Sequence, residues 1–160
     1  MRTLILGIGN PIMRDDGAGI AAADELARQV KADVVTGNAS GLAVLDQLVG
    51  YDRAIIVDAT CTGRDAPGTV RRWDVAAHDA PPAPGGAHET SLPALLAWGS
   101  RTWRGFPPQV VVYTIEAERA AQVGEGLCGA VQRGVEQVVA QVVDDHFSPD
   151  SAAGAHEVLP

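Results

Sequence analysis

Two aspartates fall at positions where a parallel sheet can bring their carboxylates together. Asp16 lies in GIGNPIMRDDGAGI, residues 7–20, where a glycine-rich turn follows an apolar run and leads into an alanine-rich stretch. Asp58 closes the apolar segment IIVDA, residues 55–59. A carboxylate pair in a partly buried crevice requires a proton or a cation. The two residues therefore predict either an acid–base site or a metal site.

A histidine extends this candidate set. His88 stands where a long loop rich in proline and glycine, residues 75–87, gives way to a predicted helix. Two carboxylates and one imidazole suit a borderline divalent metal with open coordination positions. The spacing of the three residues matches no local metal motif, and His78 in the same loop is an alternative ligand. A simpler interpretation of the first motif is that Asp15 or Asp16 only caps the following helix.

The glycines of the first motif raise the question of a nucleotide site. Gly7 and Gly9 have the spacing of a dinucleotide-binding turn, but Ile12 stands where the third glycine belongs. The adjacent carboxylates of Asp15 and Asp16 would repel a phosphate. We therefore expect the glycines to form a tight turn that presents Asp16, and nucleotide binding is the weaker alternative.

Short apolar segments alternate with helical patterns along the chain, which indicates an α/β protein. The pattern predicts strands at 2–8, 32–37, 53–59, 68–74 and 108–117, and helices at 16–30, 40–50, 88–103 and 126–146. Because most of the strands are apolar on both faces, helices should cover both sides of the sheet. The weak strand at 68–74 follows its predecessor without a helix and should be antiparallel. The expected fold is a three-layer αβα sandwich around a mostly parallel, roughly five-stranded twisted sheet.

This topology also predicts how Asp16 and Asp58 meet. Ligands of open α/β sheets lie beyond the carboxyl ends of the strands, where successive connections leave on opposite faces. If the second strand flanks the first on one side, right-handed crossovers place the third strand on the other side. Asp16 follows the first strand and Asp58 ends the third, so the two carboxylates should face each other across this switch point.

Composition limits the possible classes of partner. The 160 residues suit one domain, expected over 1–147, followed by a disordered tail at 148–160. The net charge of −8 argues against a nucleic-acid partner. No apolar run is long enough to span a bilayer, and no targeting segment is evident. The two cysteines, Cys61 and Cys128, form no paired metal or disulfide motif. We expect a cytoplasmic protein.

The motif G-x-G-N-P-x-x-x-D-D-G-x-G at residues 7–19, followed by IIVDA and by a histidine that opens a helix, resembles the hydrogenase maturation proteases. The resemblance extends to about residue 146 and includes the segment SGLAVLDQL, residues 40–48. These proteins are endopeptidases that remove a short C-terminal extension from the large subunit of nickel-iron hydrogenases. The resemblance implies a metal site formed by Asp16, Asp58 and His88, and the three-layer fold described above.

The resemblance also implies a substrate, a metal and a place in maturation. The partner would be the nickel-iron hydrogenase large-subunit precursor, and the nickel already inserted into that precursor would be the metal that the site engages. Other divalent metals would also suit the three ligands. The cut would then be a late checkpoint, after which the released C-terminus closes over the metal centre. A monomer is expected.

Two mechanisms use the same residues. A metal-polarised carbonyl attacked by a carboxylate-activated water is sufficient for peptide hydrolysis. An aspartic-type route, in which Asp16 and Asp58 share a proton, is the other. A non-catalytic nickel-binding chaperone of the same large subunit would keep all three ligands and leave the length of its partner unchanged.

Overall fold

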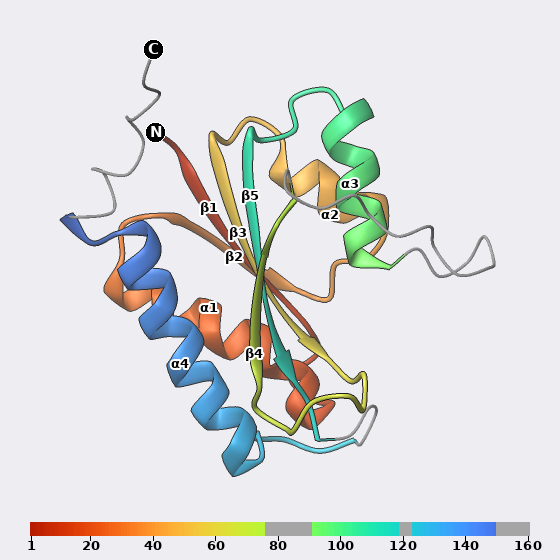
Figure 1. Cartoon of the computed structure of the whole chain (residues 1–160), viewed down its shortest axis with the longest axis vertical. Helices are drawn as coiled ribbons and strands as arrows, with labels where there is room; N and C mark the ends of the chain where they lie inside the picture. The colour runs from red at the N-terminus through yellow and green to blue at the C-terminus, as the bar shows by residue number, and fades with distance from the viewer. Residues whose placement is uncertain (76–90, 119–122, 150–160) are drawn as a thin grey trace.

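The computed structural model describes residues 1–75, 91–118 and 123–149. Within these ranges, five strands form one twisted sheet in the order β2-β1-β3-β5-β4 (Figure 1). Strands β1, β2, β3 and β5 are parallel, and β4 is antiparallel to β5. The predicted α/β class, the mostly parallel sheet and the antiparallel edge strand are therefore confirmed. The strands are β1 (Thr3–Ile8), β2 (Asp33–Gly37), β3 (Arg53–Thr60), β4 (Val70–Asp74) and β5 (Gln109–Glu116).

Four α-helices cover the two faces of the sheet (Figure 1). Helices α1 (Ala18–Gln29) and α4 (Gly129–His146) pack on one face, and α2 (Leu42–Leu48) and α3 (Leu92–Thr102) pack on the other. Alternate residues of β1 feed the two cores, because successive side chains of a strand point to opposite faces. Ile5 belongs to the α1/α4 core, whereas Leu4 and Leu6 belong to the α2/α3 core.

The order of the strands places β1 between β2 and β3, as the sequence predicted. The strand order reverses at β1, since β2 lies on one side of it and β3 on the other, so the carboxyl ends of β1 and β3 form the switch point of the sheet. In Figure 1 this edge lies at the lower end of the sheet, where the arrow of β5 points and where α1 begins. Asp16 and Asp58 both belong to this edge.

The start of α1 differs from the expectation that an aspartate caps it. A 3₁₀ turn, Arg14–Gly17, precedes the helix, and Gly17 occupies the N-cap position with no side-chain capping hydrogen bond. Neither Asp15 nor Asp16 caps α1, because both belong to the 3₁₀ turn and precede Gly17, which is the N-cap residue. Their carboxylates are thus available for other contacts.

The end of the chain is described only as far as residue 149. Helix α4 ends at His146, and the tail predicted to be disordered lies almost wholly outside the described residues. The single domain predicted over 1–147 stays a prediction. None of the helices in the described ranges is long and apolar enough to cross a membrane.

Candidate active site

The turn that carries Asp16 depends on glycines that allow close backbone contact. Gly9 has a φ of +151°, and a Cβ at this position would lie 1.9 Å from the carbonyl oxygen of Asp16. A Cβ at Gly19, in the first turn of α1, would lie 2.3 Å from the carbonyl oxygen of Ile8 and 2.4 Å from that of Val57. The glycines thus let the turn and α1 press against the ends of β1 and β3, as predicted for a turn that presents Asp16.

Asp16 is partly buried beside the end of β1. Its Oδ2 accepts a hydrogen bond from the backbone N–H of Asn10 at 2.9 Å. Residue 10 comes directly after the GIG turn, so this bond ties the carboxylate to the glycine-rich segment that leaves the strand. The 3₁₀ turn and the Asn10 N–H together fix the position of the Asp16 side chain at the carboxyl edge.

Asp58 is partly buried near the end of β3, where its environment disfavours the ionised form. Burial raises its pKa to about 7, and the negative charge of Asp16 adds to the increase. The backbone N–H of Ala59 donates toward the carboxylate and opposes the shift. The backbone of the first turn of α1, which follows Asp16, packs against β3 directly before Asp58, since a Cβ at Gly19 would lie 2.4 Å from the carbonyl oxygen of Val57.

The pair has the electrostatics of a site that takes up a proton or a cation. Of the ion pairs between described residues, none includes Asp16 or Asp58. Two neighbouring carboxylates, of which Asp58 has the raised pKa, form a donor set that fits a divalent metal. His88 and its alternative His78 lie outside the described residues, so the third ligand stays a prediction.

Asp15 has a different role from its neighbour. Its side chain is only 5% exposed, and its two oxygens accept the backbone N–H groups of Cys128 at 2.8 Å and Glu118 at 3.1 Å. Cys128 is the N-cap residue of α4, and Glu118 follows β5. Asp15 thus fastens the turn before α1 to both ends of the segment that joins β5 to α4.

The same contacts create a possible metal-binding group, Asp15, Glu118 and Cys128, whose ligand atoms lie within 4.8 Å of one another. The Asp15 oxygens already accept two backbone hydrogen bonds, which the metal would have to share. Burial, together with the nearby Asp15 carboxylate, raises the pKa of the Cys128 thiol and disfavours the thiolate that metals bind. These contacts favour a structural role for Asp15.

Glu116 is a second buried carboxylate, and the sequence pattern was not used to predict it. Glu116, the last residue of β5, is 3% exposed and bonds to the segment that follows β3. The signal that identified Asp58, an acidic residue at the carboxyl end of an apolar strand, is equally present in VVVYTIE, residues 110–116. Applied uniformly, that rule finds Glu116 as well.

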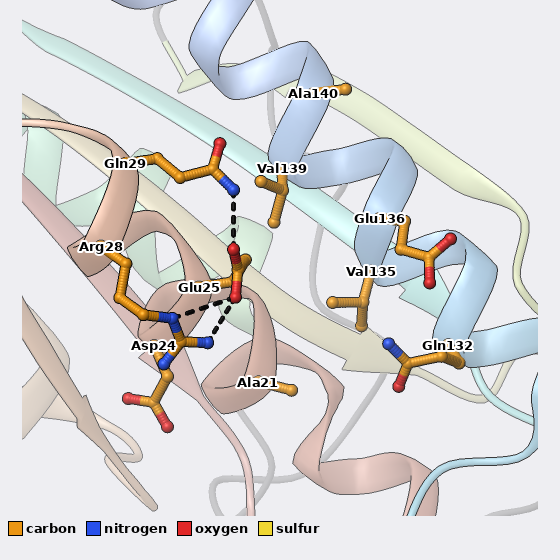
Figure 2. Close-up of a pocket in the computed structure, with 10 residues that line it drawn as sticks. All are labelled: Ala21, Asp24, Glu25, Arg28, Gln29, Gln132, Val135, Glu136, Val139 and Ala140. Carbon is orange, nitrogen blue, oxygen red and sulfur yellow. Dashed lines mark hydrogen bonds and ion pairs between the residues drawn. The ribbon is translucent and has the colours of Figure 1, made fainter.

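A groove of about 660 Å³ lies away from this edge, between α1 and α4 (Figure 2). The apolar residues that line the groove are Ala21, Val135, Val139 and Ala140. Its acidic residues are Asp24, Glu25 and Glu136. Glu25 is already held by Arg28 and Gln29, as the dashed lines in Figure 2 show. Neither Asp16 nor Asp58 lines the groove. The paired carboxylates at the edge of the sheet are therefore the stronger candidate site.

The fold and the site together define a class: a three-layer α/β protein with two interacting carboxylates at the switch point of its sheet. Comparisons with known proteins make this assignment specific. The family model of the hydrogenase maturation proteases matches residues 20–145. This chain belongs to the hydrogenase maturation protease family.

A curated relative and several solved structures are similar to the chain. The hydrogenase 2 maturation protease of Escherichia coli is 30% identical over 74 residues, which is 44% of this chain and 45% of the relative. The match thus spans less than half the length of that protein. A hydrogenase-maturating endopeptidase from E. coli superposes with a TM-score of 0.71 at 21% identity, covering 96% of this chain and 94% of that one.

A nickel-iron hydrogenase maturation protease from Thermococcus kodakarensis superposes with a TM-score of 0.64 at 24% identity. This superposition covers 90% of the present chain and 98% of the T. kodakarensis protein. At these identities, the two superpositions establish a shared fold across nearly the whole chain.

Proposed function

We propose that this protein is an endopeptidase that removes the C-terminal extension of a nickel-iron hydrogenase large-subunit precursor after nickel insertion. The observation that carries the proposal is the interaction of Asp16 with Asp58 at the switch point of the sheet in a member of this protease family. The expected location is the cytoplasm, and the expected state is a monomer.

Asp16, Asp58 and His88 form the proposed site. Asp16 is held by the Asn10 N–H and offers a carboxylate oxygen to the nickel that the precursor carries. Asp58 has a pKa of about 7, which suits a group that takes a proton from water and returns it to the leaving amine. His88 supplies an imidazole as the third ligand. A bound divalent metal supplies polarisation of the scissile carbonyl.

The aspartic-type route assigns the same carboxylates without a metal-polarised carbonyl. Asp16 and Asp58 then share one proton, because two close carboxylates do not both ionise freely. The ionised member activates water and the protonated member donates to the departing nitrogen. In this route, nickel serves for recognition of the precursor only.

The test is intact mass spectrometry of a nickel-loaded precursor incubated with the native protein, with Asp16→Asn or with Asp24→Asn. Asp24 is an exposed aspartate on α1 and is the matched control. The native protein and D24N should release one defined C-terminal peptide, and D16N should be slower by about 10²–10⁴-fold. A precursor that binds tightly and is never shortened would instead support the nickel-binding chaperone.

A further inference from the structure

Glu116 is a buried carboxylate that the proposed chemistry does not use. It ends β5 in register with Thr60 of β3, and two register pairs earlier Thr114 lies opposite Asp58. The Glu116 carboxylate is thus one strand away from Asp58 and near the same edge of the sheet. Burying a charge is costly unless hydrogen bonds compensate, so its contacts must account for it.

Those contacts converge on the segment 60–63, which follows Asp58 in the chain. Oε1 accepts the backbone N–H groups of Thr62 at 2.7 Å and Gly63 at 2.8 Å. Oε2 accepts the hydroxyl groups of Thr60 at 3.2 Å and Thr62 at 3.1 Å. A single side chain therefore satisfies two backbone donors and two hydroxyl donors where β3 turns away from the sheet.

The backbone of Glu116 is itself held firmly. Its N–H donates to the carbonyl of Thr69 at 2.9 Å, and its carbonyl accepts the N–H of Gly68 at 2.7 Å. The following residue, Ala117, donates to the carbonyl of Thr60 at 2.7 Å. Glu116 therefore gives the segment after β3 a fixed attachment to β5.

Only one residue of the chain, Ala59, separates Asp58 from segment 60–63, which Glu116 holds. The Ala59 N–H, which donates toward the Asp58 carboxylate, lies between Asp58 and the segment that Glu116 holds. Movement of residues 60–63 would shift this donor and the direction of the Asp58 side chain. A small displacement of a reacting group is enough to slow catalysis strongly.

We propose that Glu116 is a positioning residue: its hydrogen bonds to segment 60–63 orient Asp58 for peptide cleavage. The inference rests on the proposed function, since it concerns the rate of that reaction. It assigns Glu116 no contact with the substrate and no proton transfer.

The test compares Glu116→Ala with Glu116→Gln in cleavage of the nickel-loaded precursor. Glutamine is nearly isosteric: its carbonyl oxygen can accept the N–H groups of Thr62 and Gly63, and its amide can donate to the two hydroxyl oxygens. We expect E116A to lower kcat by about tenfold to a hundredfold with KM within about threefold of wild type. E116Q should restore kcat to within about threefold of wild type.

The control is Asp145→Asn, because Asp145 also accepts a hydrogen bond from a residue of β5, Tyr113, but belongs to the last turn of α4. D145N should lower the melting temperature without changing kcat. Hydrogen exchange of the peptide covering residues 58–63 provides a readout that needs no activity. It should be at least about tenfold faster in E116A than in wild type or E116Q.

Four results would overturn the positioning role. The first is a kcat in E116A no lower than in D145N, and the second is a loss in E116Q equal to that in E116A. The third is unchanged exchange of residues 58–63. A rise in KM alone would also overturn it, because segment 60–63 would then act by contacting substrate. If wild-type protein does not cut the precursor, the proposed function fails, and exchange still tests the attachment.

Discussion

At the scale of single residues, the chain uses carboxylates of similar chemistry for different tasks. Burial raises the pKa of Asp58 to about 7, and the negative charge of Asp16 adds to the increase. Asp15 and Glu116 are more fully buried, but each accepts backbone N–H groups at short distance. Asp15 and Glu116 each accept two backbone N–H groups and Asp16 accepts one, that of Asn10, so the number of donors differs between the structural carboxylates and the candidate reactive one.

The raised pKa of Asp58 predicts a pH-dependent effect on stability. Because the folded state holds the proton up to about pH 7 and the unfolded state releases it near 3.8, Asp58 destabilises the fold as pH rises through this range. Asp58→Asn should therefore stabilise the metal-free protein at pH 8 by about 2–4 kcal/mol. Urea unfolding should show this gain shrinking as pH falls from 7 toward 4.

A constant difference between D58N and wild type across this range would contradict the assignment. Asp24→Asn, at an exposed position on α1, is the control and should show no such pH-dependent gain.

At the scale of elements, the site depends on how closely α1 approaches the sheet. Gly19 lets the first turn of α1 contact the carbonyl groups at the ends of β1 and β3. Asp15 then ties the turn before α1 to the N-terminus of α4 and to the end of β5. The Asp16 turn is therefore held from both sides by backbone contacts.

Gly19→Ala should destabilise the protein by about 2 kcal/mol or more. Its Cβ would lie 2.3 and 2.4 Å from two backbone oxygens, which outweighs the gain of about 1 kcal/mol in helix propensity. Gly129→Ala is the matched helical control, since its Cβ would meet only the end of the Arg133 side chain at 3.6 Å. Thermal unfolding should leave G129A within about 0.5 kcal/mol of wild type. Equal stability of both variants would refute close packing at Gly19.

Asp15→Ala should cost about 1–3 kcal/mol, because it leaves the N–H groups of Glu118 and Cys128 without their acceptor. Hydrogen exchange should rise most at the start of α4. The exposed Asp24→Ala serves as the control for urea unfolding. A loss of stability seen only when a divalent metal is present would contradict this structural role and point to the group of Asp15, Glu118 and Cys128 as a metal site.

At the scale of the whole molecule, the two ends of the sheet respond to acid in opposite directions. His146, the last residue of α4, contacts Tyr113 and has its pKa lowered to about 4 by burial and by the charge of Arg53. The unfolded chain therefore takes up this proton near pH 6.5, before the folded protein does. His146 thus destabilises the fold as pH falls from about 6.5 to 4, whereas Asp58 stabilises it over much of that range.

His146→Gln should reduce the loss in free energy of unfolding that wild type shows as pH falls below about 6.5. Stability near pH 8 should change little. Glutamine keeps a group that can bond to the Tyr113 hydroxyl but does not titrate. Measured by urea unfolding of metal-free protein from pH 4 to 8, wild type should lose stability relative to H146Q below about pH 6.5. A parallel pair of curves would show that His146 titrates alike in both states.

Much of the site follows from the sequence because topology determines it. Asp58 ends an apolar strand, and the rules of strand order are enough to place it near Asp16. The expectation that Asp15 caps α1 was wrong for a physical reason. Its carboxylate accepts hydrogen bonds from two backbone N–H groups that lie 103 and 113 residues away in the chain, and local capping preferences cannot anticipate such partners. His88 lies outside the described residues, so its role stays a prediction.

The proposed reaction of this chain is the cut of a nickel-loaded large-subunit precursor at one peptide bond. The most direct measurement is the mass of the precursor, with and without inserted nickel, before and after incubation with the native protein. We expect the nickel-loaded precursor alone to lose a single C-terminal peptide, with the mass of one water added across the two products. Full-length precursor after prolonged incubation, with nickel confirmed in place, would contradict it.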